Sequence, residues 1–434
     1  MASVPAAHRR RRAWPRISLL RRLGWGIGDQ AVSSLTNFVV AATAAHQLDA
    51  THLGAYSLAF LTYTVALTAS RGLATDPLMV RLSGSDPATW RSAVRRSTGT
   101  ATVVGVTAGL IVMLVALYVP APISGAMLAL GLVLPFLLLQ DAWRYAFFVD
   151  GRPKAALVND LVWAAALVPT ITVVAEMSEP SAFGFVLAWG CSAGVAALAG
   201  CWQAWCLPRP GQTRAWLVAH RDLNVRFMME GMAGSGSGQL RASGVSYTLG
   251  LSAVGYLQVV NTLMGPFQVL LHGSGAVFIP ELGVLARENL DRVRSACLVR
   301  GMALAAAALS WGLLLWILLP HGLGQLVVGD LWVEARPLVP LATVSLMGTS
   351  LMAGAGAGLH ALGGARRSLR VMLACSTLVV VLSVGGAVVA GLPGTMIGTA
   401  IAAWTGVVLA WRALRNQVAE DRALRAQALP EAVS

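Results

Sequence analysis

Long apolar stretches alternate with short polar, arginine-rich segments over almost the whole chain. A helix needs roughly 20 largely apolar residues to cross the hydrocarbon core of a bilayer, and it satisfies its own backbone hydrogen bonds there. The pattern therefore predicts an all-α integral membrane protein. It indicates twelve transmembrane helices, near residues 24–45, 53–74, 99–117, 124–148, 156–175, 183–205, 228–249, 256–281, 296–319, 338–360, 371–390 and 395–414.

The seventh of these helices is weak by hydropathy, because it contains Glu230, Arg241 and a glycine-serine run at residues 234–238. The basic segments on either side of residues 228–281 must lie on the same side of the membrane. Since residues 256–281 cross once, a second crossing is required. A polar span is tolerated when it lines protein or a water-filled cavity.

Thirty of the 32 Lys and Arg residues fall in seven clusters that are separated by pairs of apolar stretches; only Arg241 and Arg336 lie elsewhere. Cytoplasmic loops retain Lys and Arg in membrane proteins. We therefore expect all seven clusters, and both termini, on the cytoplasmic side of the membrane. The external connections are then short, and the longest is near residues 321–337.

The composition agrees with a membrane protein, since 56% of the residues are hydrophobic, only 12% are charged and the mean hydropathy is +0.67. A soluble domain carries about 25% charged residues. The net charge of +13 is explained by the loop clusters, so we expect no nucleic-acid partner.

Catalytic and metal-binding patterns are absent from the sequence. The five cysteines lie in or at the ends of apolar segments without a CxxC pair, which is typical of small buried hydrophobic residues. No HExxH, GxSxG or Walker motif occurs. We expect no enzyme activity, no catalytic residue, no metal site and no cofactor.

The two halves of the chain look like copies. A shift of 201 residues places Asp29 over Glu230 and Gly54 over Gly255, and it also places Arg71 over His272. Each half has six spans, an even number, so parallel repeats are predicted: two pseudo-symmetric six-helix lobes around a central cavity. The expected divisions are a basic cytoplasmic tail (1–22), an N-lobe (23–206), a cytoplasmic linker (207–226), a C-lobe (227–415) and a cytoplasmic tail (416–434).

Polar residues follow single helical faces in several of these spans. The spacings i, i+4 and i+7 place residues on one side of a helix. Such stripes predict a hydrophilic cleft, since an ionisable residue at a helix centre costs about 2.5–3.5 kcal/mol on insertion scales. The stripes are Asp29, Ser33, Thr36 and Asn37; Tyr63, Thr64, Thr68 and Arg71; Glu230, Gly234, Ser237 and Arg241; and Asn261, Gly265, Gln268 and His272.

Each candidate also has a structural interpretation. Arg241 is the one basic residue well inside a span, and an ion pair with an acid on a neighbouring helix is the alternative to ligand binding. Arg71 and Arg144 lie near cytoplasmic helix ends, where snorkelling is usual, and the i, i+3 spacing of Arg144 and Asp141 favours a local pair. His272 is more typical of a packed histidine. The run 234–238 has no GK[ST], so it indicates close helix packing or an unwound segment.

Residues 29–37 (DQAVSSLTN), residues 48–57 (LDATHLGAYS) and the segment 147–154 (FFVDGRPK) resemble the polysaccharide-exporting flippases of the MATE/MOP exporter superfamily. The layout is similar from about residue 23 to 415. This resemblance implies an alternating-access flippase that carries a lipid-diphosphate-linked oligosaccharide across the bacterial plasma (inner) membrane for cell-surface polysaccharide assembly. It also implies cationic cavity residues that meet the diphosphate. Candidate substrate-binding residues are Arg241, Arg71, Arg144, Asn37, Gln268 and His272, and candidate ion-coupling residues are Asp29 and Glu230.

The resemblance leaves other functions open. An ion-coupled drug/cation antiporter of the same superfamily is the alternative, because an acidic residue in the first helix, as at Asp29, suits it. A membrane glycan polymerase or ligase would need a sizeable external loop, and a transport-dead scaffold would recruit glycosyltransferases through its basic loops. A major-facilitator transporter is disfavoured, since residues 83–94 lack its Gly/Asp/Arg signature. Expected partners are the lipid-linked glycan, membrane lipids, H+ or Na+, and glycan-assembly proteins.

Overall fold

The computed structural model describes residues 16–82, 86–318 and 322–428, and in these ranges the regular elements are helices. The N-terminal half contains α1 (Arg16–Gln47), α2 (Ala50–Ser70), the π-helical turn η1 (Arg71–Thr75), α3 (Asp76–Leu82), α4 (Pro87–Ala116), α5 (Ile123–Val149), α6 (Pro153–Ala175) and α7 (Ala182–Ala204).

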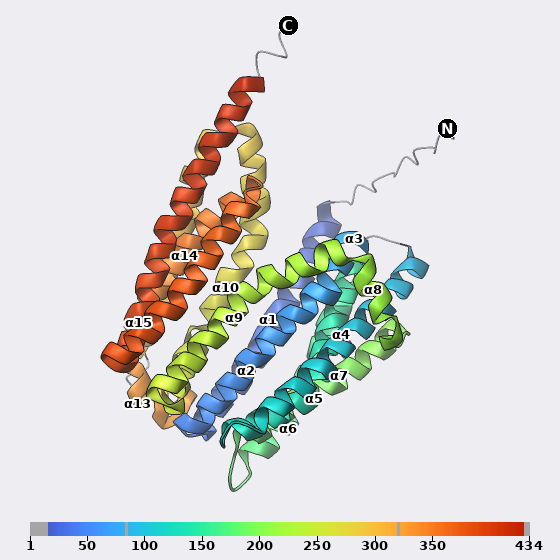
Figure 1. The fold of residues 1–434 in the computed structure, drawn as a ribbon, viewed down its shortest axis with the longest axis vertical. Coiled ribbons are helices and arrows are strands. Elements are labelled where there is room, and N and C mark those ends of the chain that lie inside the picture. Colours follow the sequence, from blue (N-terminus) through green and yellow to red (C-terminus); the bar gives the residue numbers. More distant parts are fainter. Residues whose placement is uncertain (1–15, 83–85, 319–321, 429–434) are drawn as a thin grey trace.

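A short connection leads from these helices to the C-terminal half of the chain (Figure 1). It holds η2 (Pro210–Gln212) and α8 (Thr213–Ala219). The helices that follow are α9 (Arg221–Leu249), α10 (Leu251–Glu288), α11 (Leu290–Leu318), α12 (Leu323–Val328), η4 (Gly329–Leu331), α13 (Trp332–Ala335), η5 (Arg336–Leu338), α14 (Val339–Ala361) and α15 (Ala365–Ala428).

Side-chain caps fix where several helices begin. The Asp49 carboxylate accepts hydrogen bonds from the backbone N–H groups of Thr51 and His52 at 2.8 Å. Asp86 caps α4 in the same way, with Pro87 at the first helical position. Caps of this kind satisfy N–H groups that have no partner inside the helix.

Nine helices within the described residues are long and apolar enough to cross a membrane. Their outer faces expose large apolar side chains; on α4, for example, Leu110, Ile111 and Leu114 are each more than half exposed. A water-soluble surface does not carry such a density of apolar side chains. The chain is therefore a multi-pass membrane protein.

The helix α15 consists of two arms, because Ala390 and Gly391 have non-helical backbone angles. The arms fold back on each other: a Cβ atom on Gly386 would lie 2.1 Å from the carbonyl oxygen of Gly394, and one on Gly398 would lie 2.0 Å from that of Leu382. Only glycine allows two helices to approach so closely. These arms match the predicted helices at 371–390 and 395–414.

Several helices extend beyond the predicted boundaries. The helix α1 starts at Arg16, inside the predicted tail 1–22; α9 starts at Arg221, inside the linker 207–226; and α15 runs to Ala428, inside the tail 416–434. Contacts with neighbouring helices hold the polar extension of α15. Arg422 pairs with Asp291, and Arg425 donates to the carbonyl oxygen of Ala286. Hydropathy marks the membrane boundary but not the end of such a helix.

The helix α2 lies beside α9 and packs closely on α10 (Figure 1). A Cβ atom added at Gly54 would lie 2.1 Å from the carbonyl oxygen of Leu251, and one at Gly255 would lie 2.0 Å from that of Ala50. Gly255 and Leu251 stand 201 residues after Gly54 and Ala50. The 201-residue shift therefore relates the Gly54–Leu251 contact to the Gly255–Ala50 contact, so the two halves make equivalent, reciprocal contacts.

One other contact follows the same shift, and a pair of turns has matching geometry in the two halves. The Ser57 hydroxyl donates to Gln258 Oε1 at 2.9 Å, and these residues are also 201 positions apart. The turn after α5 and the turn after α14 have equivalent glycines, Gly151 and Gly363, both with φ of 71°. In both turns the residue after the glycine donates to the carbonyl five residues earlier, as in a Schellman motif.

We expect Gly54→Ala to destabilise the protein, because the new methyl group would overlap the Leu251 carbonyl and push α2 away from α10. Overpacking of this kind costs about 1–3 kcal/mol. The measurement is the melting temperature of the purified protein in detergent. The matched control is Gly356→Ala on α14, where an added Cβ meets no atom within 4 Å. Equal melting temperatures for the two variants would contradict the packing described here.

Candidate functional site

A polar cavity of about 280 Å³ lies among α9, α10, α14 and α15. All four helices contribute hydrogen-bonding side chains to it. They are Ser237 and Arg241 from α9, Asn261 and Gln268 from α10, Ser345 and Thr349 from α14, and Thr399 from α15. The remaining lining is apolar or glycine, so the cavity combines one cation with a set of neutral polar groups.

Arg241 is half-buried in this cavity. Among the described side chains, no carboxylate lies within ion-pair distance of its guanidinium. The alternative interpretation of Arg241, an ion pair with an acid on a neighbouring helix, therefore has no support in the described residues. A guanidinium that faces neutral groups in a membrane cavity is suited to bind an anion, because it offers two parallel N–H donors to a phosphate or carboxylate.

The neutral groups in the cavity are oriented by their own helices. The Ser345 hydroxyl donates to the carbonyl of Leu341 at 2.9 Å, and the Thr349 hydroxyl donates to that of Ser345 at 3.0 Å. Their protons are thereby used inside α14, and their lone pairs remain as acceptors. Such acceptors suit the hydroxyl groups of a sugar or the waters around an anion.

The glycine-rich run of α9 is helical throughout, so it is not an unwound segment. Just before the run, Gly231 faces α2, where an added Cβ atom would lie 2.2 Å from Thr68. Gly238 borders the cavity, and an added Cβ atom there would be in ordinary contact with Leu61 at 3.8 Å. Gly234 lies on the cavity side, and an added Cβ there would meet nothing within 4 Å. The glycines therefore allow α2 to approach α9 on one side and leave open space on the other.

A second polar group lies in the N-terminal half, where two arginines and two aspartates form a quartet, Arg71, Asp141, Arg144 and Asp160. Arg71 donates from Nε and Nη2 to the two carboxylate oxygens of Asp141, at 2.9 and 2.6 Å. Arg144 Nε lies 3.2 Å from Asp160 Oδ2, and Arg144 Nη1 lies 3.8 Å from Asp141 Oδ1. The predicted Asp141–Arg144 pair is present, but Asp141 has its shorter contacts with Arg71.

The quartet is deeply placed. The side chains of Asp160 and Asp141 are 0% and 6% exposed, and that of Arg144 is 10% exposed. Arg144 therefore does not snorkel to water; it meets two carboxylates instead. With two positive and two negative groups the quartet is neutral in sum, as buried charges require.

Arg71 is positioned by the π-helical turn η1 between α2 and α3. A π turn disturbs the regular helical hydrogen bonds, and side chains from other segments bind its carbonyls. Trp216 of α8 donates to the carbonyl of Leu73 at 3.1 Å, and Ser97 of α4 donates to that of Ala74 at 2.9 Å. The predicted linker is thus docked on the N-terminal helices through Trp216.

Sequence reasoning did not single out Asp160 or the amides that surround it. Gln140 donates to Asp160 Oδ1 at 2.8 Å, and Asn159 donates to the carbonyl of Ala196 at 2.8 Å and to Gln203 at 3.1 Å. The available signal was the Asn159–Asp160 pair inside the apolar stretch 156–175. A buried acid in a span is costly, so this pair alone indicated a cation nearby.

The other predicted site residues are distributed as follows. Gln268 lies in the cavity with Arg241, whereas Arg71 and Arg144 lie together in the quartet. Asn37 of α1 belongs to neither group; its Oδ1 atom is buried without a hydrogen-bond donor among the described residues. The side chains of Asp29, Glu230 and His272 are outside the described part of the structure.

Metal-binding geometry is not seen in the part of the chain that the structure describes, where no group of three His, Cys, Asp or Glu side chains is suitably placed. All five cysteines are free.

Comparison with known proteins identifies the fold. No family model matches the chain. No curated protein matches it either. Among solved structures, a multidrug resistance MATE family transporter of the MOP superfamily, in an inward-facing conformation, has a TM-score of 0.67 at 14% identity, over 91% of this chain and 98% of that one.

Two further structures share this fold. The lipid II flippase MurJ, in an inward closed conformation, has a TM-score of 0.66 at 11% identity, over 88% of this chain and 85% of that one. A MOP superfamily transporter from Pyrococcus furiosus, for which a reversed polarity of the binding pocket suggests a different function, has a TM-score of 0.54 at 15% identity, over 94% and 97%. The chain thus has the fold of MATE and MOP-superfamily membrane transporters and flippases.

Proposed function

We propose that the chain is an alternating-access flippase that moves a lipid-diphosphate-linked oligosaccharide across the bacterial plasma membrane for cell-surface polysaccharide assembly. The observation that carries the proposal is Arg241, a cation without a described acidic partner in a cavity of neutral polar groups. A diphosphate needs a cation, and the sugars need hydrogen-bonding groups. The drug-transporter and lipid-flippase neighbours have nearly equal TM-scores, so the fold alone does not choose between them.

The proposed architecture is twelve spans in two six-helix lobes around a central cavity. The nine apolar helices of the described residues are joined by α1, by the polar α9 and by the second arm of α15. The reciprocal glycine contacts between α2 and α10 and the equivalent turns at Gly151 and Gly363 support two matched halves. Alternating access then consists of one half rocking against the other around the α2–α10 contact.

The proposed cycle starts with the cavity open toward the cytoplasm. The arginine clusters on that side attract the anionic head group, and Arg241 binds the diphosphate with its guanidinium. Asp29 and Glu230 bind H+ or Na+, and their change of charge shifts the balance between the inward and outward arrangements. Both termini face the cytoplasm, and glycan-assembly proteins meet the chain there.

Reconstitution into liposomes tests this function. The purified protein is offered a panel of fluorescent undecaprenyl-diphosphate-linked sugars, and in parallel a panel of cationic dyes with H+ or Na+ gradients. We expect the lipid-linked sugars to cross and the dyes not to cross. Dye transport that depends on Asp29 and not on Arg241 would replace the proposal with the drug/cation antiporter. Transport of neither class would favour the scaffold.

A further inference from the structure

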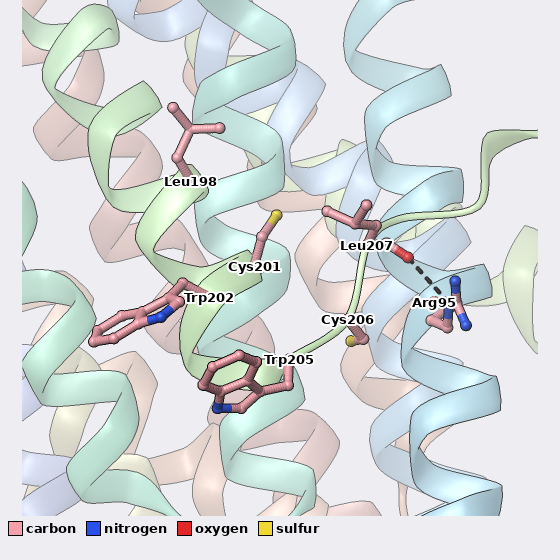
Figure 2. Close-up of a pocket in the computed structure, with 7 residues that line it drawn as sticks. All are labelled: Arg95, Leu198, Cys201, Trp202, Trp205, Cys206 and Leu207. Carbon is pink, nitrogen blue, oxygen red and sulfur yellow. Dashed lines mark hydrogen bonds between the residues drawn. The ribbon is translucent and has the colours of Figure 1, made fainter.

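A second cavity lies on the outer surface of the N-terminal half, away from Arg241. It has a volume of about 450 Å³ and lies between the end of α7 and the first turns of α4 (Figure 2). It is lined by Arg95, Leu198, Cys201, Trp202, Trp205, Cys206 and Leu207. Because it is open to the outside of the bundle, its natural occupant comes from the surrounding bilayer rather than from the central passage.

This cavity lies at the height of the membrane–water boundary. The helix α7 has 23 residues, about 34 Å at 1.5 Å per residue, which is close to the thickness of the hydrocarbon core. Its last turn carries Trp202 and is followed directly by Trp205; these side chains are 70% and 77% exposed. Exposed tryptophans are typical of the interface, and the arginine clusters on either side of this region predict that it is the cytoplasmic interface.

The wall of the cavity next to α7 is apolar and is shaped by a special backbone turn. Trp205 has φ of 49°, in the left-handed region, where a non-glycine residue is strained. The turn is closed by hydrogen bonds from Trp205 N–H to the Trp202 carbonyl and from Cys206 N–H to the Cys201 carbonyl. The result is an exposed aromatic surface that lies with Leu198 on one side of the cavity, opposite Arg95 (Figure 2).

The opposite wall is cationic. Arg95 donates from Nε to the carbonyl of Leu207 at 3.3 Å, and this contact holds its guanidinium at the rim (Figure 2). Among the described residues, no carboxylate pairs with Arg95. Burial raises the pKa of the Cys206 thiol, while the nearby charges of Arg95 and Arg91 lower it. Arg152 also acts on this thiol, but it pairs with Asp150, so Arg95 and Arg91 provide the positive charge at this end of the cavity.

We infer that this groove binds one anionic phospholipid of the inner leaflet, with its phosphate on Arg95 and an acyl chain along Leu198 and Trp202. The charge of the rim selects the occupant. A zwitterionic lipid brings an ammonium group into a region that already carries the guanidinium groups of Arg95 and Arg91, whereas an anionic head group does not. The occupant also fits the shape, because the cation lies at the head-group level and the apolar wall continues toward the hydrocarbon.

Native mass spectrometry of the full-length protein tests the inference, with phosphatidylglycerol and phosphatidylcholine titrated in separate experiments. We expect wild type to retain phosphatidylglycerol preferentially. Arg95→Gln should weaken that binding about fivefold, the factor that one cation contributes at an anionic surface. Trp202→Ala should weaken both lipids and keep the preference. Arg292→Gln, an exposed arginine on α11, is the control and should bind as wild type does.

Three results would overturn the inference: equal binding of both lipids by wild type, unchanged phosphatidylglycerol binding by Arg95→Gln, or an equal loss in Arg292→Gln. Inorganic phosphate at millimolar concentration is a further arm. If it displaces phosphatidylglycerol completely, the groove is a site for free phosphate rather than for a lipid. This inference does not depend on the transported substrate, since lipid retention is measured without transport.

Discussion

Arg241→Ala is expected to abolish flipping of lipid-diphosphate-linked sugars in proteoliposomes while the protein remains folded. A hydrogen bond to a charged group contributes about 1.5–3 kcal/mol, so the loss of two such bonds to the diphosphate weakens binding by more than about a hundredfold. The fold should not suffer, because Arg241 has no described carboxylate that would be left unpaired. Flipping rates, with thermal melting as the check on folding, provide the measurement.

Two further variants sharpen this prediction. Arg241→Lys keeps a charge but loses the planar pair of donors, so an intermediate rate is expected. Arg336→Ala is the matched control: this arginine lies outside the cavity, with its guanidinium 5.2 Å from the centre of the Trp316 ring. Wild-type rates in Arg241→Ala would remove Arg241 from the mechanism.

Asp141→Asn is expected to reduce the free energy of unfolding by about 3–5 kcal/mol, the cost of leaving a buried charge without its partner. Asp141 is 6% exposed and is the carboxylate bound by two nitrogens of Arg71. Its neutralisation leaves Arg71 and Arg144 facing the single carboxylate of Asp160. Thermal or denaturant unfolding in detergent measures the effect.

The control for Asp141→Asn is Asp291→Asn. Asp291 also pairs with an arginine, Arg422, but both side chains are more than 60% exposed, and exposed pairs contribute only about 0–1 kcal/mol. The double variant Asp141→Asn/Arg71→Gln restores neutrality and should recover part of the loss. A loss in Asp141→Asn no larger than in Asp291→Asn would contradict the view that the quartet holds the N-terminal helices together.

The fold was predictable because membrane insertion imposes its rules on the sequence. Apolar stretches at 124–148 and 183–205 coincide with α5 and α7 within about one residue, since no other structure crosses a bilayer. The polar helix 228–249 was not predicted from its hydropathy. It was predicted because two clusters on the same side of the membrane must be separated by an even number of crossings. What sequence could not show was how far helices continue into water, as α15 does to Ala428, because those extensions depend on partners distant in the chain.

The candidate site was predictable only along single helices. The spacing of Gly234, Ser237 and Arg241 predicted one helical face, and all three residues line the polar cavity. The described lining of this cavity comes from helices of the C-terminal half, whereas the sequence predicted a cleft shared by both halves. Contacts between helices could not be predicted in this way. Arg71 pairs with Asp141, 70 positions away, and nothing in either segment specifies that pairing. Likewise, nothing in the sequence of the linker indicated that Trp216 would donate a hydrogen bond to the carbonyl of Leu73.

Solvent access to the Arg241 cavity is the most direct test of the account, whose central claim is a wet passage that opens alternately to both sides. In a cysteine-free background, Asn261→Cys, at an exposed position in the cavity, is treated with a membrane-impermeant thiol reagent from each side of sealed vesicles. Leu110→Cys, on the lipid-facing side of α4, is the control. The account predicts labelling of Asn261→Cys from both sides, with protection by lipid-diphosphate; labelling no faster than that of Leu110→Cys from either side would contradict it.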